Sequence, residues 1–307
     1  MRWTSEMLPD QTAKTCIVTG ATSGLGLWCT AALAARGAHV IMPVRDVPKG
    51  EAVADRIRAA RPGAYVTIES LDLASLHSIA AFAGRINGAG TAIDVLLNNA
   101  GLGLQPERHV TEDGFERQFG TNHLGHFALT AQLVPALLRA EHPRVVTVSS
   151  VAHRRGAMQW NDPNLATGYD GRVAYNQSKL ANLMFALELA ARAAAQSSRL
   201  ASLAAHPGLS RTGFVTATDM PAWKRISFEI ATRIISQSAE EGSRPLLYAA
   251  AMPDARNGEY WGPGNFKEIN GPPALAKPWP QALVAGDRTR LWEISEKMTG
   301  VVFPELK

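Results

Sequence analysis

A glycine-rich turn between a predicted strand and a predicted helix constrains the fold of this chain more than any other feature. Residues 15–19, TCIVT, form a short apolar run that is typical of a buried strand. The turn TGATSGLG follows at residues 19–26, and a helical pattern continues to Arg36 before Gly37 ends it. Strand, glycine-rich turn and helix in this order are the setting that a dinucleotide-binding site requires.

Each glycine of the turn has its own physical role. Gly20 permits the tight turn, Gly24 lets the backbone approach a pyrophosphate, and Gly26 lets the helix pack closely against the strand. The helix N-terminus then presents unpaired N–H groups and the positive end of its dipole to phosphates. The spacing is G-x-x-x-G-x-G rather than the commoner G-x-G-x-x-G. A plain flexible turn is the alternative, which the flanking strand and helix disfavour.

Strand-like and helix-like segments alternate along the chain, with no internal repeat and no linker. Further buried strands are expected at residues 39–44, 65–71, 93–101, 144–150 and 200–205. This alternation predicts one doubly wound α/β sheet with helices on both faces. We expect residues 1–307 to form a single domain, with a dinucleotide-binding half at about 15–150. The catalytic helix, a substrate loop and a C-terminal segment would then occupy residues 151–307.

The end of the second strand indicates which dinucleotide binds. In such folds this strand end meets the adenosine ribose, where a carboxylate binds the 2′-hydroxyl of NAD and an arginine can bind the 2′-phosphate of NADP. Arg45 stands at the strand end, and Asp46 follows with Pro48 in the pattern of a helix N-cap. NADP is therefore the expected cofactor. Asp46 as a ribose ligand leaves NAD open, and a surface charge is the alternative for Arg45.

Two further strand ends place polar or small residues at the edge of the sheet where ligands bind. Asp72 lies beyond the third strand and could also cap the helix that begins near Ser75. Gly101 lets the backbone pass close to a nucleotide, and Asn98 can bond the crossing strands. Asn122 lies inside a helix expected at about residues 111–139, where a kink or a bound water would explain an otherwise unfavourable residue.

The segment AYNQSKLAN at residues 174–182 places Tyr175 and Lys179 four residues apart in a predicted helix, so both lie on one face. A nearby cation favours phenolate over phenol and lowers a pKa that starts near ~10. Such a tyrosine can exchange a proton with a substrate oxygen near neutral pH. An ordinary amphipathic helix is the alternative, because the motif is short. Two hydroxyls, Ser149 and Ser150, end the preceding strand at the same edge.

Composition argues against several other functions. The chain is 46% apolar and 19% charged, with a net charge of +4, a pI near 9.2 and scattered basic residues, so no nucleic-acid-binding stripe is evident. Cys16 and Cys29 form no metal-ligand pattern and are expected as small buried thiols. The start lacks the apolar core of a signal peptide, and no run reaches the ~18 apolar residues of a membrane span. We therefore expect a cytoplasmic protein with no metal, membrane or nucleic-acid partner.

Six motifs together resemble the short-chain dehydrogenase/reductase family. TGATSGLG, NNAG, Asn122, the VSS strand end, YNQSK and HPGLSRT occur in the order of that family over about residues 15–212. The tail, with NGEYWGPGNF and RLWEISEKMTG, is similar to the retinol-dehydrogenase-like branch, which includes light-dependent protochlorophyllide reductases. The resemblance implies a Rossmann fold with a mostly parallel sheet of seven strands. It also implies hydride transfer between NADP and a carbonyl or alcohol.

Residue by residue, the resemblance implies a catalytic set of Asn122, Ser150, Tyr175 and Lys179. Tyr175 would be the general acid in reduction and the base in oxidation, while Lys179 would lower its pKa and hold the nicotinamide ribose. Ser150 would hydrogen-bond the substrate oxygen, with Ser149 as the alternative. Asn122 would anchor the water of a proton relay leading to Lys179. The residues expected to line the cofactor are Thr19, Gly20, Ser23, Gly24, Leu25, Gly26, Arg45, Asp72, Leu73, Asn98, Ala100, Gly101, Tyr175, Lys179, Pro207, Gly208 and Thr212.

The expected function is that of an oxidoreductase, an NADP(H)-dependent carbonyl reductase or alcohol dehydrogenase. Its substrate would be an apolar or aromatic aldehyde, ketone or alcohol. Apolar residues around the expected site favour this class, although each could simply pack in the core or a lid: Leu102, Leu104, Trp160, Leu209, Phe214 and Trp223. The gap from Ser150 to Tyr175 is longer than in many relatives, and the N-terminal anchor of animal retinol enzymes is missing, which weakens retinoids as the substrate.

Two other functions stay open at this stage. One is reduction of a C=C bond, as in the protochlorophyllide branch. The other is a catalytically silent NADP-binding sensor or regulator, a class that usually lacks the tyrosine or the lysine, whereas this chain has both. The resemblance also implies a homodimer or homotetramer formed through the long helices around Asn122 and Tyr175.

Overall fold

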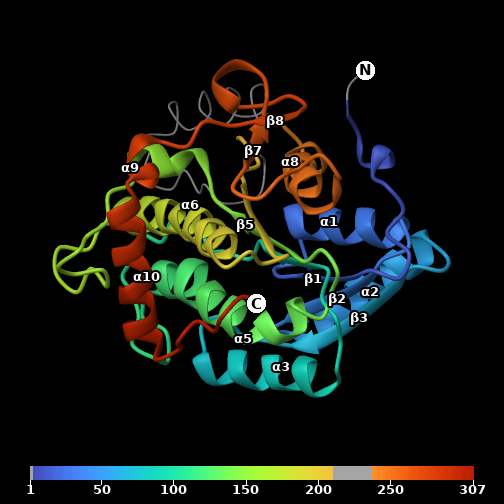
Figure 1. The fold of residues 1–307 in the computed structure, drawn as a ribbon, viewed down its shortest axis with the longest axis horizontal. Helices are drawn as coiled ribbons and strands as arrows, with labels where there is room; N and C mark the ends of the chain where they lie inside the picture. Colours follow the sequence, from blue (N-terminus) through green and yellow to red (C-terminus); the bar gives the residue numbers. More distant parts are fainter. Residues whose placement is uncertain (1–2, 210–236) are drawn as a thin grey trace.

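A computed structural model describes residues 3–209 and 237–307, which form an eight-stranded sheet with helices on both faces (Figure 1). The spatial order of the strands is β3-β2-β1-β4-β5-β6-β7-β8. Their bounds are β1 Thr15–Val18, β2 His39–Val44, β3 Tyr65–Ser70, β4 Val95–Asn98, β5 Arg144–Val148, β6 Ala201–Ala205, β7 Tyr260–Pro263 and β8 Pro273–Leu275. The order reverses between β1 and β4, and ligands of open parallel sheets bind at such a switch point.

The first seven strands pair in parallel, which matches the predicted seven. The structure adds an eighth strand, β8, that the sequence did not predict. It pairs antiparallel with β7, with Trp261 opposite Leu275 and Pro263 opposite Pro273. Only three residues long and half-exposed or exposed throughout, it has too few positions to show a hydrophobic alternation. The fold class is therefore confirmed, and the strand count is corrected to eight.

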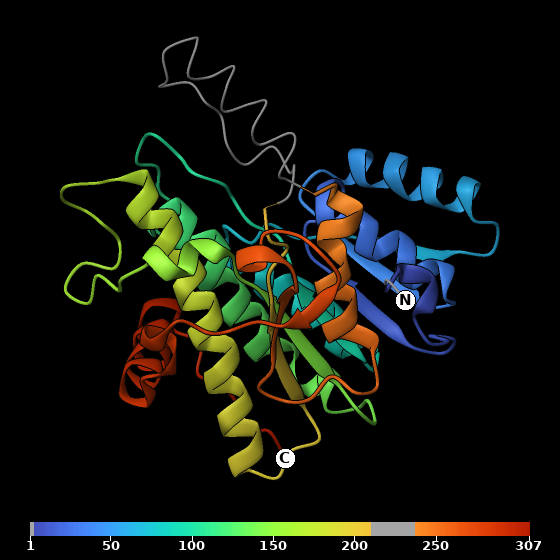
Figure 2. The same cartoon turned by 90° about the horizontal axis from the view of Figure 1, so that it is seen from above.

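Two layers of helices cover the sheet. One layer holds α1 Gly24–Ala35, α2 Val47–Ala60 and α8 Ala239–Ala251, and the other holds α3 Leu76–Gly88, α5 Gly125–Leu137 and α6 Gly171–Ala195. Figures 1 and 2 show α10 Ala285–Thr299 packed on the outer side of α6. The short helices are α4 Arg117–Phe119 and α9 Pro280–Leu283, the 3₁₀ turns Ser5–Met7, Val151–Arg155 and Phe266–Glu268, and a π-helical turn Gly120–Leu124.

Strands buried on both faces explain why the sequence shows continuous apolar runs. In β1, Cys16 and Val18 contact the layer of α1, whereas Ile17 between them contacts the layer of α3 and α5. Cys29 of α1 lies in the same core as Cys16, so both thiols are buried, as predicted. Among the described residues, none of the helices combines the length and the apolar character needed to cross a bilayer.

Candidate active site

A cavity of about 930 Å³ lies along the carboxyl ends of the parallel strands, from the first turn of α1 to α6. Most of the predicted site residues line it: Thr19, Gly20, Ser23, Gly24, Leu25, Arg45, Asp72, Leu73, Ala100, Gly101, Ser150, Tyr175, Lys179, Pro207 and Gly208. Gly26, Asn98 and Asn122 are absent from its lining, and Thr212 falls outside the described residues. The fold thus brings predicted residues from the ends of β1 to β6 and from the helices α1 and α6 to one cavity.

The glycine-rich turn has the geometry that a pyrophosphate requires. Gly20 has φ +67° and Gly24 has φ +55°, both in the left-handed region that favours glycine. A β-carbon on Gly26 would lie only 2.3 Å from the carbonyl oxygen of Gly20, so α1 can approach the turn only with glycine there. Ser23 makes no side-chain cap to α1, which leaves the first N–H groups of the helix available to a phosphate. These features fit a dinucleotide.

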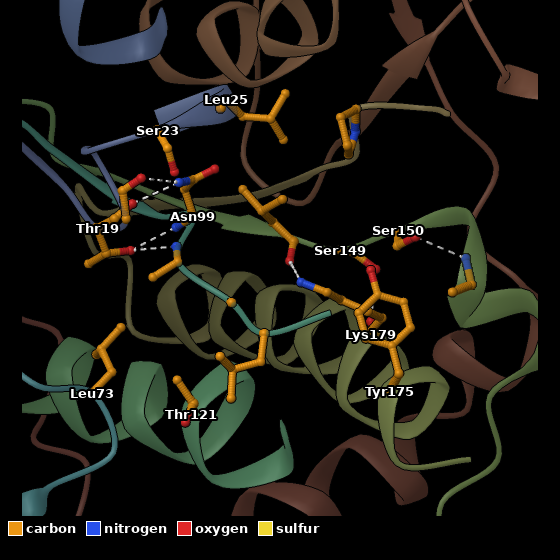
Figure 3. A pocket seen from close by; sticks show the side chains of 18 of the residues that line it. Thr19, Ser23, Leu25, Leu73, Asn99, Thr121, Ser149, Ser150, Tyr175 and Lys179 are labelled. Atoms are coloured by element: carbon orange, nitrogen blue, oxygen red, sulfur yellow. Dashed lines mark hydrogen bonds between the residues drawn. The ribbon is translucent and has the colours of Figure 1, made fainter. Parts of the chain in front are cut away.

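A hydrogen-bonded clip joins the glycine-rich turn to the end of β4. The Thr19 hydroxyl accepts from the backbone N–H groups of Asn99 and Ala100, each at 2.9 Å. The Asn99 Nδ2 donates back to the Thr19 carbonyl at 2.7 Å (Figure 3). Asn98, by contrast, is fully buried and donates to the Thr130 hydroxyl at 2.9 Å. Asn99 therefore lines the cavity, whereas the sequence prediction chose Asn98.

The ends of β2 and β3 provide the charged part of the cavity. Asp46 caps α2, its Oδ1 accepting from the backbone N–H of Lys49 at 3.0 Å, as the sequence predicted. Arg45 is exposed and lines the cavity together with Lys49. Asp72 also lines it and accepts from the Ala74 N–H, while Ser75 rather than Asp72 caps α3.

The two serines that end β5 have different partners. Ser149 is buried and donates from its hydroxyl to the Lys179 carbonyl at 2.8 Å. Ser150 is half-buried, caps the 3₁₀ turn Val151–Arg155 by accepting from the Ala152 N–H at 3.2 Å, and lines the cavity together with Tyr175. Figure 3 shows Tyr175 extending from α6 toward this pair, whereas Lys179 turns to a backbone carbonyl, that of Val148. The Ser150 hydroxyl can therefore donate to a ligand beside Tyr175, whereas the Ser149 hydroxyl already donates to the backbone.

Burial sets the pKa values of the tyrosine and the lysine. It raises the pKa of Tyr175 above its usual value, and the neighbouring Ser150 hydroxyl only partly opposes this. Burial also lowers the pKa of Lys179 to about 8. The Lys179 ammonium donates to the Val148 carbonyl at 3.3 Å and lies 5.9 Å from the centre of the Tyr175 ring. The predicted lowering of the tyrosine pKa by Lys179 is thus wrong here, because the lysine points at the backbone and desolvation dominates.

Replacing Lys179 with Met should stabilise the fold at neutral pH. Its pKa falls from 10.5 to about 8 on folding, which at about 1.36 kcal/mol per unit corresponds to a penalty of about 3 kcal/mol below pH 8. Between pH 8 and 10.5 the unfolded chain binds the extra proton, so the wild-type protein gains stability as the pH rises. Urea unfolding should give Lys179→Met a larger free energy of unfolding than the wild type at pH 7. At pH 10 this difference in free energy should be smaller. The exposed Lys14→Met is the control, and an equal difference at both pH values would refute the assignment.

Asn122 lies in the π-helical turn Gly120–Leu124. This turn is the local irregularity that an asparagine inside a helix led us to expect. The Asn122 side chain accepts from the Leu102 N–H at 2.7 Å and donates to the Leu102 carbonyl at 3.1 Å and the Ser178 hydroxyl at 3.0 Å. Its own carbonyl accepts from Nδ1 of His126 at 3.0 Å. Asn122 thus braces the loop after β4 against α6, and its role in a water relay stays a prediction.

A buried polar network behind Ser150 escaped the sequence analysis. His153 donates from Nδ1 to the Ser150 carbonyl at 2.6 Å, and burial lowers its pKa to about 4, so the ring is neutral. Glu268 accepts from Nε2 of His206 at 3.1 Å and from the Arg154 guanidinium at 2.5 Å. The network fixes the C-terminal segment against the end of β6. Its partners are 62 and 114 positions apart in the chain, so no local pattern could reveal them.

Comparison with known proteins agrees with this geometry. A family model described as short chain dehydrogenase matches residues 14–221. Retinol dehydrogenase 14 from Mus musculus is 35% identical over 94% of this chain and 86% of its own length. Retinol dehydrogenase 13 from Homo sapiens is 36% identical over 96% and 87%. The crystal structure of an uncharacterized protein from Mycobacterium paratuberculosis is 40% identical, covers 99% of this chain and all of its own, and superimposes with a TM-score of 0.82.

Proposed function

The chain belongs to the short-chain dehydrogenase/reductase family as a retinol-dehydrogenase-like oxidoreductase of CH–OH and C=O groups, and from that premise we propose that it is an NADP(H)-dependent carbonyl reductase or alcohol dehydrogenase. One observation carries the proposal. The Ser150 and Tyr175 hydroxyls meet in the same cavity that begins at the glycine-rich turn, with Lys179 on the next turn of α6.

The residues of the chain divide the reaction between them. The turn at Gly20 and Gly24 and the first turn of α1 would hold the pyrophosphate, and Arg45 the 2′-phosphate. When bound, NADPH supplies the hydride that the carbonyl carbon receives. Ser150 donates a hydrogen bond to the carbonyl oxygen, and Tyr175 donates the proton that turns it into a hydroxyl. The raised pKa of Tyr175 keeps the phenol protonated at neutral pH, which suits reduction.

The walls near Tyr175 support an apolar or aromatic substrate. Leu102, Leu104 and Leu209 line the cavity, as the sequence analysis expected. Val151 and Ile269 also line it. Trp160 is absent from the lining and stacks under the Arg290 guanidinium at 4.6 Å, while Phe214 and Trp223 lie outside the described residues.

A panel of aldehydes tests this proposal. NADPH oxidation should be faster with decanal and benzaldehyde than with short polar aldehydes such as glyceraldehyde, because apolar walls recover free energy only from apolar surface. NADPH binding without turnover of any aldehyde or ketone would instead favour the catalytically silent sensor.

Replacing Arg45 with Asp should shift cofactor preference from NADPH toward NADH. The arginine would lose a charge-assisted pair with the 2′-phosphate, and the new carboxylate would repel it while accepting from a ribose 2′-hydroxyl. We expect the NADPH to NADH ratio of kcat/KM to fall at least about 100-fold, since a charged pair becomes a like-charge contact. Arg61→Asp, an exposed arginine outside the cavity, is the matched control. An unchanged NADPH affinity in Arg45→Asp would remove Arg45 from the cofactor site.

A further inference from the structure

One face of α6 forms a wall of the cavity beyond the catalytic pair. Arg172, Tyr175, Asn176 and Lys179 all line the cavity, and their spacing of three, four and seven residues places them on one helical face. Exposure falls along this face, from the exposed Arg172 through the half-buried Tyr175 to the buried Lys179. Arg172 therefore lies on the solvent side of Tyr175, about 4.5 Å further along the helix axis.

A second arginine lines the cavity next to α6. The 3₁₀ turn that begins after Ser150 ends at Arg155, which is exposed and lines the cavity. The next residue, Gly156, packs so tightly on α6 that a β-carbon there would lie 2.6 Å from the Asn176 carbonyl oxygen. The end of this turn is thus held directly beside the residue that follows Tyr175. Arg172 is thus about one helical turn from Tyr175, and Arg155 ends the 3₁₀ turn that Ser150 begins.

These two arginines carry charge that no described residue neutralises. Arg154, their neighbour, is paired with Glu268. Within residues 3–209 and 237–307, the guanidinium groups of Arg155 and Arg172 form no ion pair and no hydrogen bond. The acid nearest to Arg172 in the chain, Asp170, uses its Oδ1 to cap α6 through the N–H groups of Arg172 and Val173.

The acidic residues of the cavity lie elsewhere. Among the described residues, only Asp46 and Asp72 contribute carboxylates to the lining, and both follow the strands β2 and β3 on the far side of the glycine-rich turn. The Tyr175 end is therefore basic and partly enclosed by apolar walls. A concave surface of one sign with low-dielectric walls concentrates ligands of the opposite charge.

We propose that the substrate of this site is an aldehyde or ketone with an apolar body and a carboxylate, which Arg172 and Arg155 bind while the carbonyl lies at Tyr175. This deepens the proposed function and rests on it. Arginine suits the task because its planar guanidinium holds a carboxylate through two parallel hydrogen bonds. The separation along α6 sets the spacing, with the carboxylate about one helical turn from the carbonyl.

A matched pair of substrates tests the proposal. The probes are 4-carboxybenzaldehyde and its methyl ester, which share the ring and the aldehyde and differ in charge. The measured quantity is the ratio of kcat/KM for acid over ester with saturating NADPH. We expect the wild-type ratio to exceed one, and to fall about three- to tenfold in Arg172→Gln and in Arg155→Gln, as for a partly exposed charge-assisted pair. Arg61→Gln, outside the cavity, should keep the wild-type ratio. Raising the ionic strength should lower the ratio in the wild type.

A binding measurement separates this proposal from the reaction itself. Calorimetric titration of 4-(hydroxymethyl)benzoate into the protein with NADPH, a combination in which no hydride can be transferred, should give a dissociation constant about three- to tenfold weaker in Arg172→Gln and Arg155→Gln. If neither aldehyde is turned over while this arginine-dependent binding persists, the anion site stands and the proposed reaction fails. A wild-type ratio of one or below, or a ratio and an affinity that both variants leave unchanged, would overturn the proposal.

Discussion

Tyr175→Phe should lower kcat for aldehyde reduction by about 10²- to 10⁴-fold, the range of a positioned general acid. The variant keeps the ring and its packing but loses the hydroxyl that transfers a proton to the carbonyl oxygen in the proposed reaction. Ser149 cannot replace it, because its hydroxyl already donates to the Lys179 carbonyl. NADPH binding should survive, because the pyrophosphate site lies at the opposite end of the cavity. Stopped-flow NADPH oxidation and fluorescence titration of NADPH measure the two effects separately.

Tyr65→Phe is the matched control, because it removes the same group, a phenol hydroxyl, outside the cavity. Tyr65 begins β3 and is 59% exposed. This variant should keep wild-type kcat. A Tyr175→Phe protein that retains more than about a tenth of wild-type kcat would assign the proton to another group.

Gly26→Ala should cost both stability and cofactor affinity. The new methyl group would lie 2.3 Å from the Gly20 carbonyl oxygen and 2.5 Å from Nδ2 of Asn99. Neither neighbour can yield freely, since Gly20 is backbone and Asn99 is bonded to Thr19 at 2.7 Å. Overpacking of this kind costs about 1–3 kcal/mol, and moving the turn displaces the phosphate site with it. We expect a lower urea midpoint and about 5- to 100-fold weaker NADPH binding, the factor to which a cost of this size corresponds.

Gly84→Ala is the matched control for that substitution. Gly84 lies inside α3, and a β-carbon there would meet no atom within 4 Å. Alanine is the better helix former, so this variant should gain up to about 1 kcal/mol. If Gly26→Ala unfolds at the wild-type midpoint and binds NADPH as tightly, the close contact between α1 and the turn has no energetic weight.

Local patterns in the sequence predicted the parts of the site that depend on neighbours along the chain. The glycines of the turn, the Asp46 cap and the shared face of Tyr175 and Lys179 all follow from spacing and residue type. Each depends on backbone geometry over a few residues, which spacing and residue type determine directly.

The structure corrects the sequence predictions at positions whose environment depends on tertiary contacts. Which asparagine of the pair faces the cavity depends on Thr19, 80 positions away, to which Asn99 bonds. The sign of the Tyr175 pKa shift depends on how deeply α6 is buried and on Lys179 turning to Val148. β8 forms by pairing with the edge of β7, and its three residues are too few to show the alternation of apolar and polar residues that indicates a strand. These contacts join elements that are distant in sequence, so no window of residues contains them.

Transfer of deuterium from the cofactor tests the central claim most directly. The protein would be incubated with NADPH deuterated at the transferable position of C4 and with decanal, benzaldehyde or 4-carboxybenzaldehyde, and the alcohol analysed by mass spectrometry. We expect one deuterium on the carbinol carbon of at least one product with wild-type protein, and a rate at least about 100-fold lower with Tyr175→Phe. Saturating NADPH binding with no deuterium in any alcohol, or equal transfer by both proteins, would contradict it.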